Sequence, residues 1–273
     1  MDEAELNDFY SDHFSAEYRG GVLPSGKMLK EMHERAEPRH EFVKANLKLE
    51  ERAEVLEIGC ATGHFLHLMA SDGYVCSGIE PDVGFSAYGK KQLGLNVKTE
   101  MLNLGEFQTK KYDLICIFHA LEHLVDPMEV LNTFHRAIKD NGYLFIEIPD
   151  LTAAIRRKRF DPETYFHKAH LYDFTLETIK TYLAKTGFSI IRTAHDAPCP
   201  KDKNLLILAA KTTPPVKEMP VKPGGYEALQ DYFVNEYGGR RHHPTQNILK
   251  RVIRKSPGGE ALLRVLRDLM PSR

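Results

Sequence analysis

The segment from Ala53 to Lys211 alternates short apolar runs with helix-like stretches, and this alternation restricts the fold of the chain more than any other feature. Repeated units of strand and helix predict a parallel sheet covered by helices. The runs are strongly apolar, as expected for strands that are buried on both faces. The first five runs cover residues 53–59, 74–80, 96–102, 112–118 and 143–149.

The last two apolar runs, 188–194 and 204–210, predict a different connection. Only the segment HDAPCPKDK separates them. That segment is too short for a helical crossover between parallel strands, so we expect an antiparallel hairpin. Residues 53–211 are therefore predicted to form an α/β domain around a seven-stranded, mostly parallel sheet with a terminal antiparallel hairpin.

The composition changes on both sides of this domain. Residues 1–52 are polar with helical periodicity and predict a helical N-terminal cover, interrupted at Pro38. Residues 212–225 contain four prolines and two glycines and predict a linker. Residues 226–273 predict a basic helical C-terminal extension. Its two amphipathic helices are expected to pack on the domain or on another subunit, or to dock on an anionic membrane surface.

The composition also excludes several classes of protein. Lysine and arginine (37) balance aspartate and glutamate (38), so the charge excess typical of nucleic-acid binding is missing. The four cysteines form no CxxC pair, which argues against a disulfide framework or a zinc site. The acidic N-terminus lacks the apolar core of a signal peptide, and no run of about 18 apolar residues predicts a spanning helix. We expect a cytoplasmic protein, with peripheral membrane contact only through the extension.

The segment VLEIGCATGHFL (55–66) is the most informative motif. An apolar run ends in Glu57 and Gly59, and a helix is expected after Gly63; glycines at such a turn let the backbone approach a ligand closely. A carboxylate before the turn would repel a diphosphate but suits an ammonium group. The second run ends in Glu80, which is placed to accept hydrogen bonds from the hydroxyls of a ribose.

These residues resemble the class I S-adenosylmethionine-dependent methyltransferases, which implies a Rossmann-like fold with S-adenosylmethionine as cofactor and S-adenosylhomocysteine as product. The resemblance places the methionine end at the glycine loop, the ribose at Glu80, the adenine at Met101 and Leu102, and the sulfonium beside Phe118 and His119. The alternative is a Rossmann-like domain that binds a nucleotide without chemistry. The predicted cofactor residues are Glu57, Gly59, Cys60, Ala61, Gly63, His64, Phe65, Glu80, Pro81, Met101, Leu102, Phe118 and His119.

The fourth run continues into FHALEHLVDP (118–127), where a helical turn would place His119, Glu122 and His123 on one face. The segment resembles a subgroup that includes ubiquinone O-methyltransferases, whose Glu-x-x-Glu-His pattern can bind a divalent metal, and sugar-modifying enzymes. Three interpretations stay open. Glu122 and His123 cap the turn before Asp126; His119 or His123 is a general base; or the cluster binds a metal. We predict catalytic histidines and no metal.

A third catalytic candidate, His170, lies in the long connection after the fifth run. About 25 residues separate Pro149 from a helix expected near Thr175, and a connection of that length is typical of a lid or binding loop. His170 is either a second base or a group that holds this loop. The basic run 156–159 is either a solvated surface or a contact for a phosphate on the acceptor.

We therefore predict an S-adenosylmethionine-dependent methyltransferase that methylates a hydroxyl on a saccharide or other polar metabolite, by in-line transfer with histidine-assisted deprotonation. One alternative is a metal-assisted O-methyltransferase that acts on a phenolic or quinone precursor. Another is a catalytically silent subunit that binds S-adenosylmethionine. The expected partner is a small-molecule or glycan acceptor, and nucleic acid is not expected.

Overall fold

The computed structural model describes residues 24–155, 165, 170–195 and 204–212. The basic run 156–159, the predicted linker from residue 213 onward and the predicted extension 226–273 lie outside these residues, as does the start of the N-terminal cover. The roles predicted for those segments, including membrane or subunit contact, stay predictions. No helix among the described residues has the length and apolar character needed to cross a bilayer.

Seven strands form one sheet in the order β3-β2-β1-β4-β5-β7-β6. The first five strands are parallel, and β7 is antiparallel to both β5 and β6. The predicted Rossmann-like α/β fold with its terminal hairpin is thereby confirmed. The strands are β1 (Glu54–Ile58), β2 (Val75–Ile79), β3 (Asn96–Lys98), β4 (Tyr112–Phe118), β5 (Ile138–Pro149), β6 (Phe188–His195) and β7 (Asn204–Lys211).

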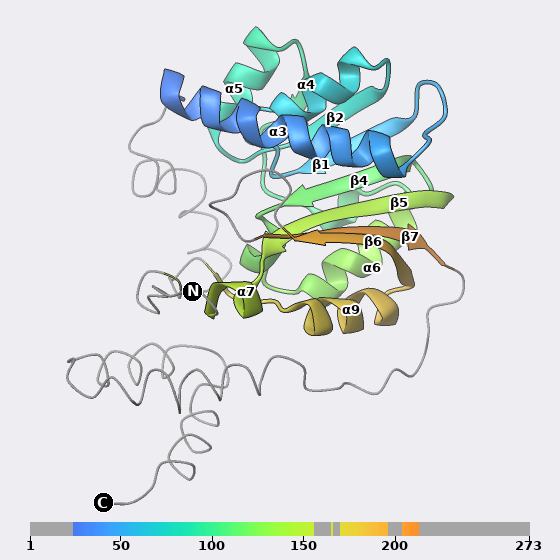
Figure 1. The fold of residues 1–273 in the computed structure, drawn as a ribbon. Helices are drawn as coiled ribbons and strands as arrows, with labels where there is room; N and C mark the ends of the chain where they lie inside the picture. The colour runs from blue at the N-terminus through green and yellow to red at the C-terminus, as the bar shows by residue number, and fades with distance from the viewer. Residues whose placement is uncertain (1–23, 156–164, 166–169, 196–203, 213–273) are drawn as a thin grey trace, which may run out of the picture.

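Helices cover both faces of the sheet (Figure 1): α3, α4 and α5 lie on one face, and α6 and α9 lie on the other. The helices are α3 (Gly26–Asn46), α4 (His64–Ser71), α5 (Val83–Gln92), α6 (Pro127–Ala137), α7 (Leu151–Ile155) and α9 (Leu176–Lys185), and two single 3₁₀ turns are η2 (Leu104–Glu106) and η3 (Leu121–His123).

Alternate residues of the strands supply two separate cores. In β4, Ile115 and Ile117 pack with residues of α6 and α9, while Leu114 and Cys116 pack with residues of α3 and α4. This alternation follows from the two-residue period of a strand, which sends successive side chains to opposite faces. A sheet that is buried on both faces explains why the strand sequences are so uniformly apolar.

Two elements differ from the expectation. The helix α3 continues through Pro38, although we expected an interruption there. Proline removes one helical hydrogen bond, but Ala36 and Val43 on either side are buried against the core beneath α3, and this packing keeps the helix in one piece. The strand β3 is also shorter than the run 96–102, so Met101 and Leu102 lie in the loop that follows it.

Two helices end in the same way and offer a matched test of packing around a turn. Gly73 follows the C-cap of α4, and Gly187 follows the C-cap of α9; both have left-handed backbones, with φ of +93° and +83°. A Cβ atom at Gly73 would meet nothing within 4 Å, whereas one at Gly187 would lie 2.6 Å from Nε2 of His135. That ring is held in place by a hydrogen bond of 2.9 Å to the carbonyl of Thr212.

We predict that Gly187→Ala destabilises the protein more than Gly73→Ala. Both substitutions should cost about 1–2 kcal/mol for a left-handed alanine. Gly187→Ala should lose about a further 1–3 kcal/mol, because the new methyl group overlaps the His135 ring. Urea unfolding of the two variants measures the difference, and equal losses would contradict the close packing at Gly187.

Candidate functional site

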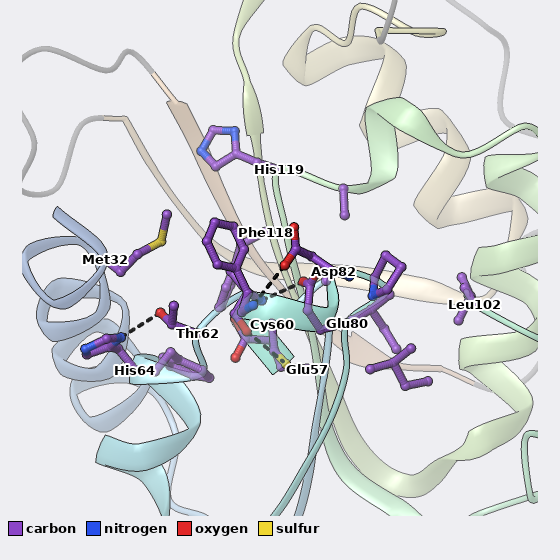
Figure 2. Close-up of a pocket in the computed structure, with 18 of the residues that line it drawn as sticks. Met32, Glu57, Cys60, Thr62, His64, Glu80, Asp82, Leu102, Phe118 and His119 are labelled. Atoms are coloured by element: carbon purple, nitrogen blue, oxygen red, sulfur yellow. Dashed lines mark hydrogen bonds between the residues drawn. The ribbon is translucent and has the colours of Figure 1, made fainter. Parts of the chain in front are cut away.

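A pocket lies at the carboxyl ends of β1, β2 and β4, where the chain leaves the sheet in opposite directions on either side of β1. Such a switch point is where open α/β sheets bind ligands. All the predicted cofactor residues except Gly63 line this pocket, and so does His123. Figure 2 shows Met32 and His64 at one side and Leu102 at the other. The role of these residues as cofactor contacts stays a prediction.

Three residues of the loop between β1 and α4 have left-handed backbone conformations, and two backbone hydrogen bonds hold the loop. Gly59, Ala61 and Gly63 have φ of +66°, +46° and +77°. The N–H of Gly59 donates to the carbonyl of Ile79 at 2.8 Å, and the N–H of Gly63 donates to the carbonyl of Cys60 at 2.8 Å. Gly63 is the N-cap of α4, so it shapes the loop from behind without lining the pocket.

The carboxylate of Glu80 fixes the loop from the end of β2. One oxygen accepts a hydrogen bond from the N–H of Ala61 at 2.8 Å, and the other accepts one from the N–H of Asp82 at 2.9 Å. Asp82 in turn caps α5 by accepting from the N–H of Phe85. A carboxylate oxygen can accept more than one hydrogen bond, so these two contacts are compatible with the predicted contact between Glu80 and ribose hydroxyls.

Glu57 is a buried carboxyl group at the base of the pocket, 3% exposed. Its Oε2 atom has no hydrogen-bond donor among the described residues. Burial raises the pKa of Glu57 to about 8, despite the opposing charge of Arg39. A buried carboxyl without a donor is costly, and an ammonium group in the pocket would remove that cost. The residue thus fits the amino end of the predicted cofactor.

The first turn of α4 forms one wall of the pocket. Oγ1 of Thr62 lies 2.7 Å from Nδ1 of His64, as the dashed line in Figure 2 shows. The His64 ring stacks on Tyr88 and meets His33 of α3 at an angle. Partial burial lowers the pKa of His64, and the nearby His33 adds to this effect. A neutral ring at this wall suits an uncharged part of a ligand.

Arg39 of α3 is a pocket residue that the sequence analysis did not find. Its Nε donates to Glu147 at 2.6 Å, and its guanidinium lies over the Phe118 ring at 4.4 Å. No motif marked it, since α3 is separated from the glycine loop in sequence and its polar pattern predicted only a cover. The other unpredicted lining residues are Met32, Arg35, Ala36, Ile58, Thr62, Ile79, Asp82, Phe85, Ala120 and Leu124.

His119 is held between two carboxylates. Its Nε2 lies 3.0 Å from Glu147, and its Nδ1 lies 3.6 Å from Glu122. Burial alone would lower the pKa of His119, but the contacts with Glu122 and Glu147 outweigh it and raise the pKa to about 9. The ring is therefore a cation at neutral pH. A cation cannot take a proton, so this geometry disfavours His119 as the base.

The expected helical turn over 119–123 forms only in part. Leu121–His123 is a 3₁₀ turn, and His119 precedes it with a left-handed φ of +51°. The His119 ring therefore turns to Glu147. The side chain of Asp126 caps α6, accepting from the N–H of Glu129, and the interpretation of Glu122 and His123 as capping residues stays a prediction.

Glu122, His123 and His170 form a cluster beside the pocket. Their candidate ligand atoms all lie within 4.8 Å of one another, and the rings of His123 and His170 meet edge to face at 4.9 Å. His123 lines the pocket, whereas His170 is not among its lining residues. The helix expected near Thr175 is confirmed, since Thr175 and Thr178 form a capping box at the start of α9.

The cluster fits a divalent cation. Both carboxylate oxygens of Glu122 are buried without a hydrogen-bond donor among the described residues. Although burial raises the pKa of Glu122, contacts with His119 and His123 lower it overall, so the group is a carboxylate. One carboxylate and two imidazoles are a donor set that transition metals accept.

Comparison with known proteins agrees with this geometry. A sequence model of the methyltransferase domain matches residues 28–193. The ubiquinone biosynthesis O-methyltransferase of Histophilus somni (strain 2336) is 29% identical over 102 residues, which are 34% of this chain and 43% of that protein. The one from Coxiella burnetii (strain RSA 493 / Nine Mile phase I) is 26% identical over 127 residues, 45% of this chain and 53% of that protein. The matches span about half the length of these relatives.

Among solved structures, the magnesium protoporphyrin IX methyltransferase from Synechocystis PCC 6803 with bound S-adenosylhomocysteine superposes with a TM-score of 0.58. The superposition covers 77% of this chain and all of that one, at 14% sequence identity. At that identity the similarity concerns the fold.

We predict that affinity for S-adenosylhomocysteine rises as the pH increases from 6 to 8. Burial raises the pKa of Glu57 to about 8 in the empty pocket, and only the carboxylate form pairs with the ligand's ammonium. Each unit of pH below 8 should lower the affinity by up to about tenfold. Titration calorimetry in buffers of different ionisation enthalpy measures both affinity and proton release.

In Glu57→Gln the affinity should be lower and nearly independent of pH over the same range. A wild-type affinity that does not change between pH 6 and pH 8 would contradict an ammonium contact at Glu57.

Proposed function

The chain belongs to the methyltransferase domain family, and from that premise we propose that it transfers the methyl group of S-adenosylmethionine to an oxygen of a small-molecule acceptor, with His123 as the base. Methyl transfer from S-adenosylmethionine is the activity that we infer from this family membership. The observation that carries the finer proposal is that His123 lines the same pocket as the cofactor loop.

The cofactor occupies the pocket from the glycine loop to Leu102 in this proposal. Glu57 pairs with its ammonium group and Glu80 with its ribose. Arg39 pairs with its carboxylate: among the described residues only Nε of this side chain is used in a hydrogen bond, which leaves both Nη groups for a planar anion. The adenine lies between Met101 and Leu102, and the sulfonium lies beside Phe118.

The reaction is an in-line displacement at the methyl carbon, so most of the catalytic effect comes from alignment. The acceptor oxygen attacks the methyl group as the bond to sulfur breaks, and the sulfur leaves with the electron pair. A hydroxyl acceptor also gives up its proton. His123 takes that proton, because histidine as a residue type titrates near neutral pH and therefore suits general base catalysis. The cationic His119 would then stabilise negative charge on the attacking oxygen.

A phenolic hydroxyl is the acceptor that we favour. The curated relatives in the comparison are named ubiquinone biosynthesis O-methyltransferases, and a phenol loses its proton more easily than a sugar hydroxyl. The saccharide hydroxyl that we preferred on sequence grounds has no comparable support. It stays a prediction, and the labelling experiment below tests both acceptors.

Metal assistance is the second candidate, and the cluster of Glu122, His123 and His170 favours it. These three side chains would hold the ion. A bound divalent cation would lower the pKa of an acceptor hydroxyl. In that case His123 would be a ligand, and its imidazole would be unavailable as a base.

We predict that the protein, incubated with methyl-labelled S-adenosylmethionine and an extract of the source cells, labels small aromatic metabolites. Label in polysaccharide or lipid-linked glycan would instead support the saccharide acceptor. Binding of the cofactor with no labelled fraction would support the silent-subunit alternative.

We predict that His123→Ala lowers turnover by about 10²–10⁴-fold, as loss of a general base does. His67→Ala is the matched control, because His67 is an exposed histidine of α4 that does not line the pocket. Chelation by EDTA separates the two candidates. Unchanged wild-type turnover supports a base, while loss of turnover that is restored by a divalent cation supports the metal cluster.

A further inference from the structure

Glu147, near the end of β5, is a branch point between three parts of the chain. Its Oε2 accepts a hydrogen bond from Nε of Arg39 at 2.6 Å. Its Oε1 lies 3.0 Å from Nε2 of His119 and accepts from Nδ2 of Asn204 at 2.7 Å. These partners come from α3, the loop after β4 and the first position of β7. A single carboxylate thus connects the helical cover, the acceptor side of the pocket and the terminal hairpin.

The sheet register puts Glu147 where it can reach all three partners. Glu147 pairs with Phe118 of β4 on one side, so it is adjacent to His119 along the sheet. On the other side β5 pairs with β7, and Asn204 lies opposite Pro149. Arg39 approaches from α3, and its guanidinium is fixed over the Phe118 ring.

The network is buried, and its carboxylate has two cationic neighbours, Arg39 and His119. The side chains of Glu147 and Arg39 are only 9% and 13% exposed. Burial would raise the pKa of Glu147, but the charges of Arg39 and His119 hold it well below its usual range. Both oxygens have donors, so the carboxylate is fixed by its partners. It does not line the pocket itself, and any effect on a ligand must pass through Arg39 or His119.

We infer that Glu147 is a positioning residue for the cofactor: by holding Arg39 at Nε, it directs the remaining guanidinium N–H groups to the carboxylate of the methionine moiety. This inference rests on the proposed function in one respect, the contact of Arg39 with that carboxylate. Without the hydrogen bond to Glu147, Arg39 would adopt many rotamers. The entropy lost when the ligand selects one of them would then weaken binding.

The test compares two ligands that differ at the amino-acid end. S-adenosylhomocysteine carries the carboxylate, and 5′-methylthioadenosine has the same nucleoside and sulfur but no amino-acid group. Glu147→Gln should lower the affinity for S-adenosylhomocysteine by about tenfold, the scale of a hydrogen bond to a charged group. Its affinity for 5′-methylthioadenosine should change by less than about twofold. Titration calorimetry on the full chain measures both.

Two further variants complete the experiment. Arg39→Gln should also lose affinity for S-adenosylhomocysteine and keep its affinity for 5′-methylthioadenosine. The double variant Arg39→Gln with Glu147→Gln should bind S-adenosylhomocysteine no more weakly than Arg39→Gln alone, because Glu147 acts through Arg39. Glu177→Gln is the matched control, since Glu177 is an exposed glutamate paired with Lys180 outside the pocket. It should leave both affinities unchanged.

The outcomes separate the inference from the proposed function. If Arg39→Gln leaves the ratio of the two affinities unchanged, the proposed contact of Arg39 is wrong. If Arg39→Gln changes the ratio and Glu147→Gln does not, the inference alone is wrong. If Glu147→Gln lowers the affinity for both ligands by the same factor, the role of Glu147 is merely structural and the inference is also wrong. If Glu147→Gln does not fold, Glu147→Asp replaces it. This variant keeps the charge but has a shorter side chain, and it should also lose affinity for S-adenosylhomocysteine alone.

Discussion

The pairing of β1 between β2 and β4 is the constraint on which the rest of this structure depends. Both pairings are parallel and both faces of the strand are covered, so the polar groups that follow each strand collect at one edge of the sheet. Glu57, the glycine loop, Glu80 and His119 reach the same pocket for this reason. The loop then has to turn back over the strand ends, and the left-handed backbones at Gly59 and Ala61 make that turn.

Two buried glutamates of the site are in opposite electrostatic situations. Glu147 has a donor on each oxygen and two cationic neighbours, so it stays charged when the pocket is empty. Glu57 has an oxygen without a donor, and burial favours its neutral form. A fixed ion network is suited to positioning, since its geometry does not change with the ligand. A carboxyl that lacks a partner is suited to recognition, because a cationic ligand supplies what the protein does not.

Much of the fold could be predicted because local signals agreed with one another. The period of the apolar residues, the short segment before β7 and the acids at the strand ends all indicated one α/β sheet with a ligand at its carboxyl edge. The predictions failed where contacts between residues far apart in the sequence determine the local structure. Packing of Ala36 and Val43 carries α3 through Pro38, and the bond to Glu147 draws His119 out of the expected turn. Arg39 and Asn204 have no local signature at all.

The sequence by itself determined the strands, the hairpin and the cofactor loop, because side-chain period, glycine placement and segment length are properties of neighbouring residues. Only the tertiary structure decided that β7 inserts between β5 and β6, and that Arg39, Glu147 and Asn204 meet at one carboxylate. It also decided which histidine is charged, since the pKa of an imidazole depends on the carboxylates around it in space. Those carboxylates come from η3 and β5, and no spacing along the chain indicates that they converge on His119.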